Sequence, residues 1–80
     1  MDERILPVIV TTDAAFNACM EQDISAIYLY REVFKGRTNK IYQTLEEHGY
    51  EIPGLPLQRG VLFVKGVDIE QCTFPIPNYL

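Results

Sequence analysis

Residues 5–12, with the sequence ILPVIVTT, are the stretch that most restricts how this chain can fold. The run is short, almost continuously apolar and rich in β-branched side chains, which together predict a buried β-strand. Pro7 has no N–H to give to a strand ladder, so we expect it at the start of this strand or on a sheet edge. A buried strand needs cover, and the remaining residues must supply partner strands and a helical layer.

Residues 11–23 and 38–49 carry the clearest helical patterns. Thr12 or Asp13 can cap the free N–H groups of the first helix, and Thr38 is the expected N-cap of the second. Both segments repeat apolar residues at helical spacing, so each helix is expected to pack one face against the sheet. The inward residues expected are Phe16, Cys19 and Met20 in the first helix and Ile41, Thr44, Leu45 and His48 in the second, which Gly49 is expected to end.

Residues 24–36, ISAIYLYREVFKG, fit either of two structures. As a helix, the segment has an apolar stripe, and Gly36 stands where a glycine commonly ends a helix. As a strand, its β-branched and aromatic content is suitable, but Arg31 falls on the same face as Leu29 and breaks the alternation. The length of the segment and its glycine ending favour the helix, and the strand alternative stays open.

Residues 60–72, GVLFVKGVDIEQC, are expected to form a β-hairpin in which Lys65 and Gly66 supply a two-residue turn. Its second arm alternates, with Val67 and Ile69 directed inward. The predicted fold class is α+β: a small sheet built from the N-terminal strand and this C-terminal β-hairpin, covered on one face by two or three helices.

The chain is short for its aromatic content. We expect its 80 residues to form a single small globular domain, 1–80, and a domain of this size buries only about 60% of the surface of its unfolded chain. Nine aromatic residues are difficult to hide in one small core, so we expect some of them to contact a partner. The aromatic residues are Phe16, Phe34, Phe63, Phe74, Tyr28, Tyr30, Tyr42, Tyr50 and Tyr79.

Charge is unevenly distributed along the chain, which has a net charge of −4 at pH 7. Residues 1–30 are acidic, whereas residues 31–40 hold four cations against one carboxylate. An acidic chain disfavours nonspecific binding to nucleic acid or to an anionic membrane. One local basic segment therefore lies inside an otherwise acidic protein.

The N-terminal residues and the cysteines indicate where in the cell the protein is expected. The N-terminus is charged and has no signal-peptide pattern, and no apolar run approaches the roughly 20 residues of a membrane span. Cys19 and Cys72 are the only cysteines. We expect a cytoplasmic protein with both thiols reduced, and a bridge between them is the less favoured alternative.

Recognisable catalytic or metal-binding motifs are absent from the sequence. Ser25 is the only serine and His48 the only histidine, and a histidine on the inner stripe of a helix is more often structural than catalytic. The cysteines lack metal-ligand spacing, the glycines are isolated, and Glu46 and Glu47 diverge by about 100° around their helix. We expect no enzymatic activity, no cofactor and no metal.

Residues 29–50 resemble the helix-turn-helix pattern, with the expected hairpin in the position of a wing. The resemblance rests on the glycine-containing turn and on the Ile41 and Leu45 spacing, and it implies a DNA-binding regulator that uses the helix 38–48. Cations at the start of that helix oppose the helix dipole, which is understandable if phosphates lie there. The residues assigned to nucleic acid in this alternative are Arg37, Thr38, Asn39, Lys40 and Gln43.

The favoured hypothesis is a small acidic protein-interaction module that binds a larger protein and inhibits or modulates it. It accounts for the aromatic excess, the basic segment and the lack of catalytic residues, since aromatic residues and arginine commonly anchor interfaces. Small acidic inhibitors of phages and mobile elements are similar in type, by analogy. The partner is expected to be another protein, and the chain itself either a monomer or a homodimer. The residues assigned to the partner are Tyr28, Tyr30, Arg37, Lys40, Tyr42, Glu46, Glu47 and Tyr50.

Overall fold

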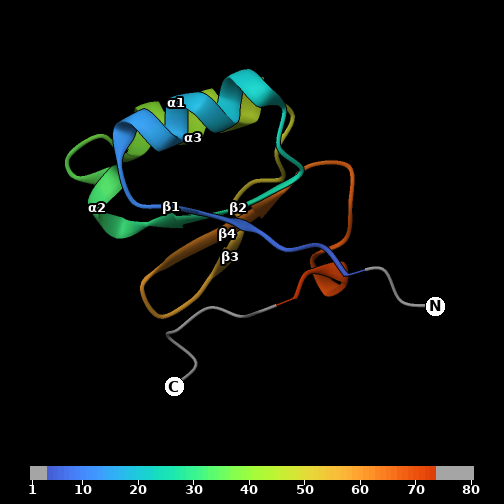
Figure 1. Cartoon of the computed structure of the whole chain (residues 1–80). Helices are drawn as coiled ribbons and strands as arrows, with labels where there is room; N and C mark the ends of the chain where they lie inside the picture. The colour runs from blue at the N-terminus through green and yellow to red at the C-terminus, as the bar shows by residue number, and fades with distance from the viewer. Residues whose placement is uncertain (1–3, 74–80) are drawn as a thin grey trace.

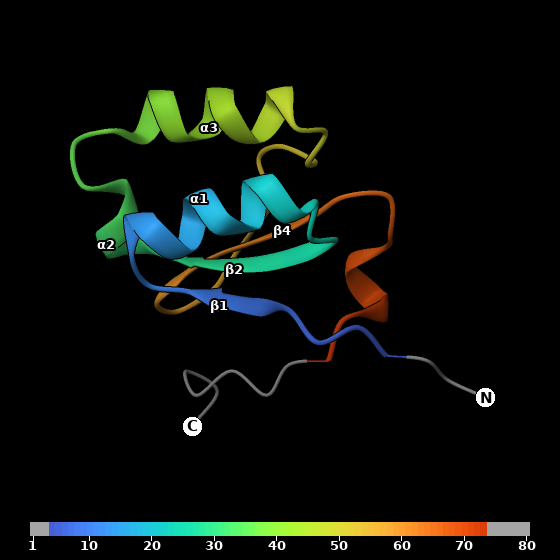
Figure 2. The ribbon, with the colours of Figure 1, turned by 45° about the horizontal axis from the view of Figure 1, so that its top comes forward.

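The structure, a computed structural model, describes residues 4–73. Four strands form one mixed sheet in the order β1-β2-β4-β3, and the α-helices cover one of its faces (Figures 1 and 2). The predicted α+β class, with an N-terminal strand and helices on one face of a small sheet, is confirmed. The elements are β1 (Val8–Val10), α1 (Asp13–Gln22), β2 (Ala26–Tyr30), α2 (Arg31–Phe34), α3 (Thr38–Glu47), β3 (Leu55–Pro56), β4 (Gly60–Val64) and a 3₁₀ helix (Ile69–Gln71).

The N-terminal part is a βαβ unit in which β1 and β2 run parallel and α1 connects them. Thr12 caps α1, because its side chain accepts a hydrogen bond from the N–H of Ala15 at 3.1 Å. Phe16 and Cys19 on α1 are buried, as expected. Pro7 directly precedes β1, which is an edge strand of the sheet. The predicted first helix is confirmed, and so is a strand within residues 5–12. The expected burial of that strand is wrong, because β1 lies at the sheet edge, where Val8 and Ile9 are exposed and only Val10 is buried.

The helix favoured for residues 24–36 is wrong, because the segment contains the central strand β2 followed by the single-turn helix α2. β2 is buried on both faces, so its sequence is continuously apolar and lacks the alternation of a half-buried strand. Ile27 and Leu29 face the helices, and Tyr28 faces the other side. Arg31 had counted against the strand, but α2 begins at Arg31, so that residue lies outside β2.

The hairpin expected over residues 60–72 is wrong in its second arm. β4 pairs with β2 on one side and with β3, which precedes it, on the other. Leu57 donates to the carbonyl of Gly60 at 2.8 Å within the β3–β4 hairpin. Because both edges of β4 are occupied, the following residues form a turn and a 3₁₀ helix. Val67 and Ile69 still pack inward, against the sheet face opposite the helices.

α3 corresponds to the second predicted helix, with Ile41 and Leu45 buried as expected. Its N-cap differs from the prediction: Arg37 occupies that position, Thr38 is the first helical residue, and no side chain caps the helix. Gly49 follows the helix with φ +93°, a conformation that glycine adopts without a steric cost.

Aromatic side chains are distributed over two apolar clusters, one between the sheet and the helices and one on the opposite face. Two clusters hide more aromatic side chains than a single small core would, but not all of those in residues 4–73, and contact of the rest with a partner stays a prediction. The side chains of Phe16, Tyr28, Tyr50 and Phe63 are buried, those of Tyr30, Phe34 and Tyr42 are half-buried, and Phe74 and Tyr79 lie outside the described residues.

Cys19 and Cys72 are free thiols that belong to different clusters, on opposite faces of the sheet. Burial raises the pKa of both thiols, which favours the protonated form. A disulfide between them would have to cross the sheet, so the structure excludes that alternative.

Tyr50 should make the fold sensitive to alkali. Burial, followed by the nearby Cys19 and Asp23, raises the pKa of Tyr50 from 10 to about 12, and its hydroxyl donates to the carbonyl of Ile24. The folded state therefore holds this proton more tightly than the unfolded state, so the stabilisation is complete below pH 10 and is lost as the pH rises towards 12. Urea unfolding on either side of pH 10 should show the free energy of unfolding falling by about 1.4 kcal/mol per pH unit from this group.

Tyr50→Phe is the control, because it removes this titration and leaves the two buried thiols in place. The gap in unfolding free energy between the wild type and Tyr50→Phe should narrow, and then change sign, as the pH rises above 10. Parallel pH profiles for the two proteins would contradict the assignment.

Candidate protein-interaction surface

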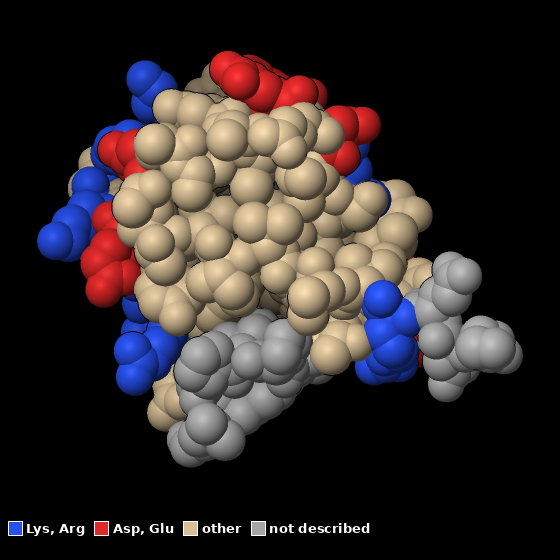
Figure 3. Space-filling model, in the orientation of Figure 1, with Lys and Arg blue, Asp and Glu red and all other residues tan. Residues whose placement is uncertain are grey.

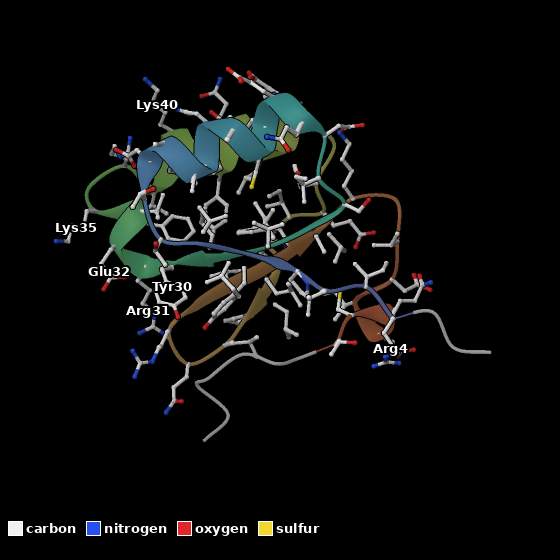
Figure 4. The ribbon with its side chains drawn as sticks, viewed as in Figure 1. Arg4, Tyr30, Arg31, Glu32, Lys35 and Lys40 are labelled. Carbon is white, nitrogen blue, oxygen red and sulfur yellow. The ribbon has the colours of Figure 1, made fainter. Side chains whose placement is uncertain are left out.

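Cations gather at one end of the molecule, beside α2 and the start of α3. Figure 3 shows them along one margin of the surface, and Figure 4 shows Arg31, Lys35 and Lys40 projecting outward there, with Glu32 among them. We call Arg31, Lys35 and Lys40 the cationic end. Its three residues belong to the basic segment 31–40 that the charge pattern singled out.

A shallow pocket of about 340 Å³ opens at the cationic end. Half-buried Phe34, Tyr42 and Val61 supply its apolar floor, and the exposed Arg31 and Lys35 stand beside them. The ring centroids of Phe34 and Tyr42 are 5.6 Å apart, and Tyr42 packs edge-on against a core ring at 5.8 Å. We call these five side chains the aromatic pocket. It combines an apolar floor with positive charge at its border.

Local contacts hold the walls of the aromatic pocket in place. The N–H of Arg31 donates to the carbonyl of Arg59 at 3.0 Å, which fixes the start of α2 to the β3–β4 hairpin. Val33, on the inner side of α2, is buried in the core. Arg37 donates to the carbonyl of Val33 at 2.8 Å and also pairs with Asp13 on α1. α2 is therefore held at both ends although it has only one turn, and the aromatic pocket is formed before any ligand arrives.

Arg37 stabilises the fold through contacts that the sequence did not reveal. Within residues 4–73 the ion pairs are Arg37–Asp13 and Lys65–Asp23, so Arg37 is already engaged. Its side chain is still 40% exposed, so its assignment to a partner or to DNA stays a prediction. Arg31 and Lys35 belong to neither pair, and their charges face solvent.

The predicted partner-binding tyrosines separate into three groups. Tyr42 contributes to the aromatic pocket. Tyr28 and Tyr50 are 0% and 4% exposed, which corrects their assignment, because core side chains cannot serve as exposed anchors. Tyr30 lies on the opposite face of the sheet, with its ring centroid 5.4 Å from that of Tyr28.

The predicted charged residues also separate along α3. Lys40 lies in the first turn, whereas Glu46 and Glu47 are exposed at the other end, about 9 Å along the helix axis. Glu47 accepts a hydrogen bond from Gln43 at 3.4 Å. The structure therefore does not bring the two glutamates together with the cationic end.

Phe34 and Val61 were not predicted as site residues, and Arg31 and Lys35 were predicted only as part of a basic segment. Val61 reaches the aromatic pocket because the β2–β4 register places it opposite Leu29, two residues before α2. The signal available in the sequence was the cluster of cations, and the apolar floor depends on strand pairing that local patterns do not encode.

Two elements that the helix-turn-helix resemblance requires, a full preceding helix and a wing, are not found beside α3 within residues 4–73. A single-turn helix precedes it where the pattern needs a full helix, and the segment expected as the wing is a turn and a 3₁₀ helix. Thr38, Asn39 and Lys40 are exposed at the start of α3, as the DNA-binding alternative requires. The resemblance therefore extends to one helix and its exposed first turn.

Other kinds of site find no support in residues 4–73. No group of three or more histidine, cysteine or acidic side chains is placed to hold a metal ion there, and none of the helices described is long and apolar enough to cross a membrane. His48 is half-buried, with Nδ1 2.8 Å from the carbonyl oxygen of Thr44. No protein-family model matches the chain, and comparisons with curated proteins and with solved structures found no match.

Proposed function

We propose that this chain is a small acidic protein-interaction module that binds a larger protein and inhibits or modulates it. The observation that carries the proposal is the aromatic pocket, an apolar floor bordered by two cations without ion-pair partners among residues 4–73. On a chain of net charge −4, such a local positive site favours a ligand that is locally negative. The ligand that fits is a peptide segment with one large apolar side chain next to Asp or Glu.

The two parts of the aromatic pocket contribute differently to binding. Burying one large apolar side chain on the floor is worth about 1.5–3 kcal/mol. Exposed ion pairs at Arg31 and Lys35 are worth only about 0.2–1 kcal/mol each. The apolar anchor therefore supplies most of the affinity, and the cations select acidic neighbours and speed association.

A peptide-display selection against the full chain tests the pocket directly. Enriched peptides should carry a large apolar residue flanked by Asp or Glu. Binding of the best peptide, measured by calorimetry, should weaken about two- to fivefold in Lys35→Gln, the loss of one exposed ion pair. Gln22→Glu is the matched control, because it changes the net charge by the same amount at the far end of α1 and should bind normally.

Two outcomes count against this site. One is the absence of any enriched peptide, and the other is an equal effect of Lys35→Gln and Gln22→Glu, which would reduce the effect to net charge alone. Modulation of a larger protein requires a second step: a stoichiometric partner purified from the native host should be released by the selected peptide and should change activity when the chain is added.

DNA binding remains the second proposal, supported by the exposed Thr38, Asn39 and Lys40 at the start of α3. It requires duplex DNA to bind with an affinity that falls steeply as salt rises, and Lys40→Ala to reduce the salt dependence. Absence of binding at low salt would remove this alternative and leave the protein-interaction proposal untouched.

A further inference from the structure

The edge strand β1 exposes an apolar stretch that the aromatic pocket does not include. The exposed fractions are 66% for Leu6, 38% for Val8 and 38% for Ile9, and all three are among the exposed large hydrophobic residues. The sequence carries no charge between Arg4 and Asp13. Alternate residues of an edge strand direct N–H and C=O groups away from the sheet, so β1 offers both apolar side chains and backbone hydrogen-bonding groups.

The two edges of the sheet are protected to different degrees. The β3 edge has only two residues, one of which is Pro56, and short strands with proline are a common protection against unwanted pairing. β1 has neither a charge nor a proline within Val8–Val10, since Pro7 stands before the strand. β1 is therefore the edge that remains competent to pair with another strand.

The surface around β1 is also uncharged. Figure 3 shows a broad face without charged side chains over α1 and β1, with the charges placed at its margins. On α1, the exposed residues Ala14 and Asn17 are small or neutral. Small side chains on α1 allow a second chain to approach closely, and this face contains none of the charges that would repel a second acidic chain.

We propose that this face binds a second copy of the chain, with β1 pairing antiparallel to β1 of the other copy across a two-fold axis. The two four-stranded sheets then become one continuous sheet, and each copy offers the same surface, as a two-fold interface requires. Two chains of net charge −4 repel each other through most surfaces, and this uncharged face lacks that repulsion.

The strand register explains how such pairing covers the exposed side chains. Val8 and Val10 lie on the helix side of the sheet, because they pair with Ile27 and Leu29 of the helix-side cluster. With Ile9 at the two-fold axis, Val8 lies opposite Val10 of the second copy, between the two α1 helices. The aromatic pocket takes no residue from β1 or α1, so the dimer presents two such pockets.

A segment near the C-terminal end of the same chain also pairs with the residues just before β1. Thr73 donates to the carbonyl of Ile5 at 2.7 Å, and Ile5 donates to Gln71 at 2.9 Å, so residues 71–73 run parallel to the start of the β1 segment. The described residues end at Thr73, beside this edge, and the chain continues for seven more residues. The experiment therefore includes a chain that ends at Thr73.

Sedimentation equilibrium of the full chain, from micromolar to millimolar concentration, tests the proposal. We expect a reversible monomer–dimer equilibrium that Ile9→Lys weakens at least tenfold, since two lysines would face each other at the axis. Ile52→Lys is the matched control, because Ile52 is 39% exposed and lies outside β1, and this variant should dimerise normally.

Ile9→Thr is a second variant that keeps the proposal testable if Ile9→Lys fails to fold. It keeps a β-branched side chain and should weaken the dimer severalfold. Amide exchange should show protection of β1 amides in the wild type at high concentration and weaker protection in Ile9→Thr at the same concentration. A wild type that stays monomeric at millimolar concentration overturns the proposal, and so does equal dimerisation of Ile9→Lys and Ile52→Lys. A monomeric full chain with a dimeric chain ending at Thr73 assigns the edge to residues 74–80 instead.

Discussion

Replacing Gly60 with alanine is expected to lower the free energy of unfolding by about 3 kcal/mol or more. Gly60 pairs with Tyr30 at the end of the β2–β4 ladder, and a Cβ there would lie 2.8 Å from the carbonyl carbon of Leu29 and 2.9 Å from the Cα of Tyr30. These are backbone atoms, so they cannot move aside without separating the two strands. A chain of 80 residues has a total stability of about 4–12 kcal/mol, so the loss is a large part of it.

Gly66→Ala is the control for the Gly60 substitution. Gly66 has φ +71° and no atom within 4 Å of an added Cβ, so alanine there meets only the cost of the left-handed conformation, about 1–2 kcal/mol. Urea unfolding of both variants should show the larger loss at Gly60. If the two losses are equal, then β2 and β4 can separate locally at little cost, and the close approach is not a constraint on the fold.

The Gly60 substitution should also disturb the aromatic pocket. The neighbouring hydrogen bond from Arg31 to Arg59 fixes the start of α2 to the same end of the ladder. An increase in the distance between β2 and β4 at Gly60 would move Arg31 relative to Val61, and both residues line the pocket. The ladder therefore contributes to binding as well as to stability.

Local sequence signals were sufficient to predict the elements whose structure is determined by their own residues. β1, α1 and α3 were predicted because capping residues, β-branched runs and helical spacing all act over a few residues. Two details of these elements were wrong. β1 was expected to be buried, but it is an edge strand with Val8 and Ile9 exposed. The N-cap of α3 is shifted by one residue from Thr38 to Arg37, whose side chain reaches Val33 and Asp13.

Errors arose where an element is defined by its neighbours in space. β2 looks helical because both of its faces are buried, and its apolar run therefore has no period of two. The hairpin was misplaced because the sequence does not show that β3, only two residues long, occupies the edge of β4. The aromatic pocket depends on the same pairing, so the sequence located its cations and not its floor.

Tyrosine burial is the most consequential of these differences, because Tyr28 and Tyr42 appeared equally suitable as interface anchors. Tyr28 is fully buried, and its hydroxyl oxygen accepts a hydrogen bond from the N–H of Arg59 at 3.0 Å. We expect Tyr28→Ala to lower the free energy of unfolding by about 3–5 kcal/mol, as for other large aromatic side chains removed from a core. Tyr42 is half-buried at the aromatic pocket, and its replacement by alanine should cost less stability and more binding.

Urea unfolding and titration with the display-selected peptide separate the two effects. Tyr28→Phe is the control: it keeps the ring and loses only the hydrogen bond to Arg59, so the expected loss is about 1 kcal/mol with normal peptide binding. Tyr42→Ala should bind the peptide at least tenfold more weakly while it remains folded. If Tyr28→Ala stays as stable as the wild type and loses the peptide, then Tyr28 is an interface residue and does not belong to the core. If Tyr42→Ala binds the peptide normally, then the apolar anchor does not enter this pocket, because Tyr42 is part of its floor.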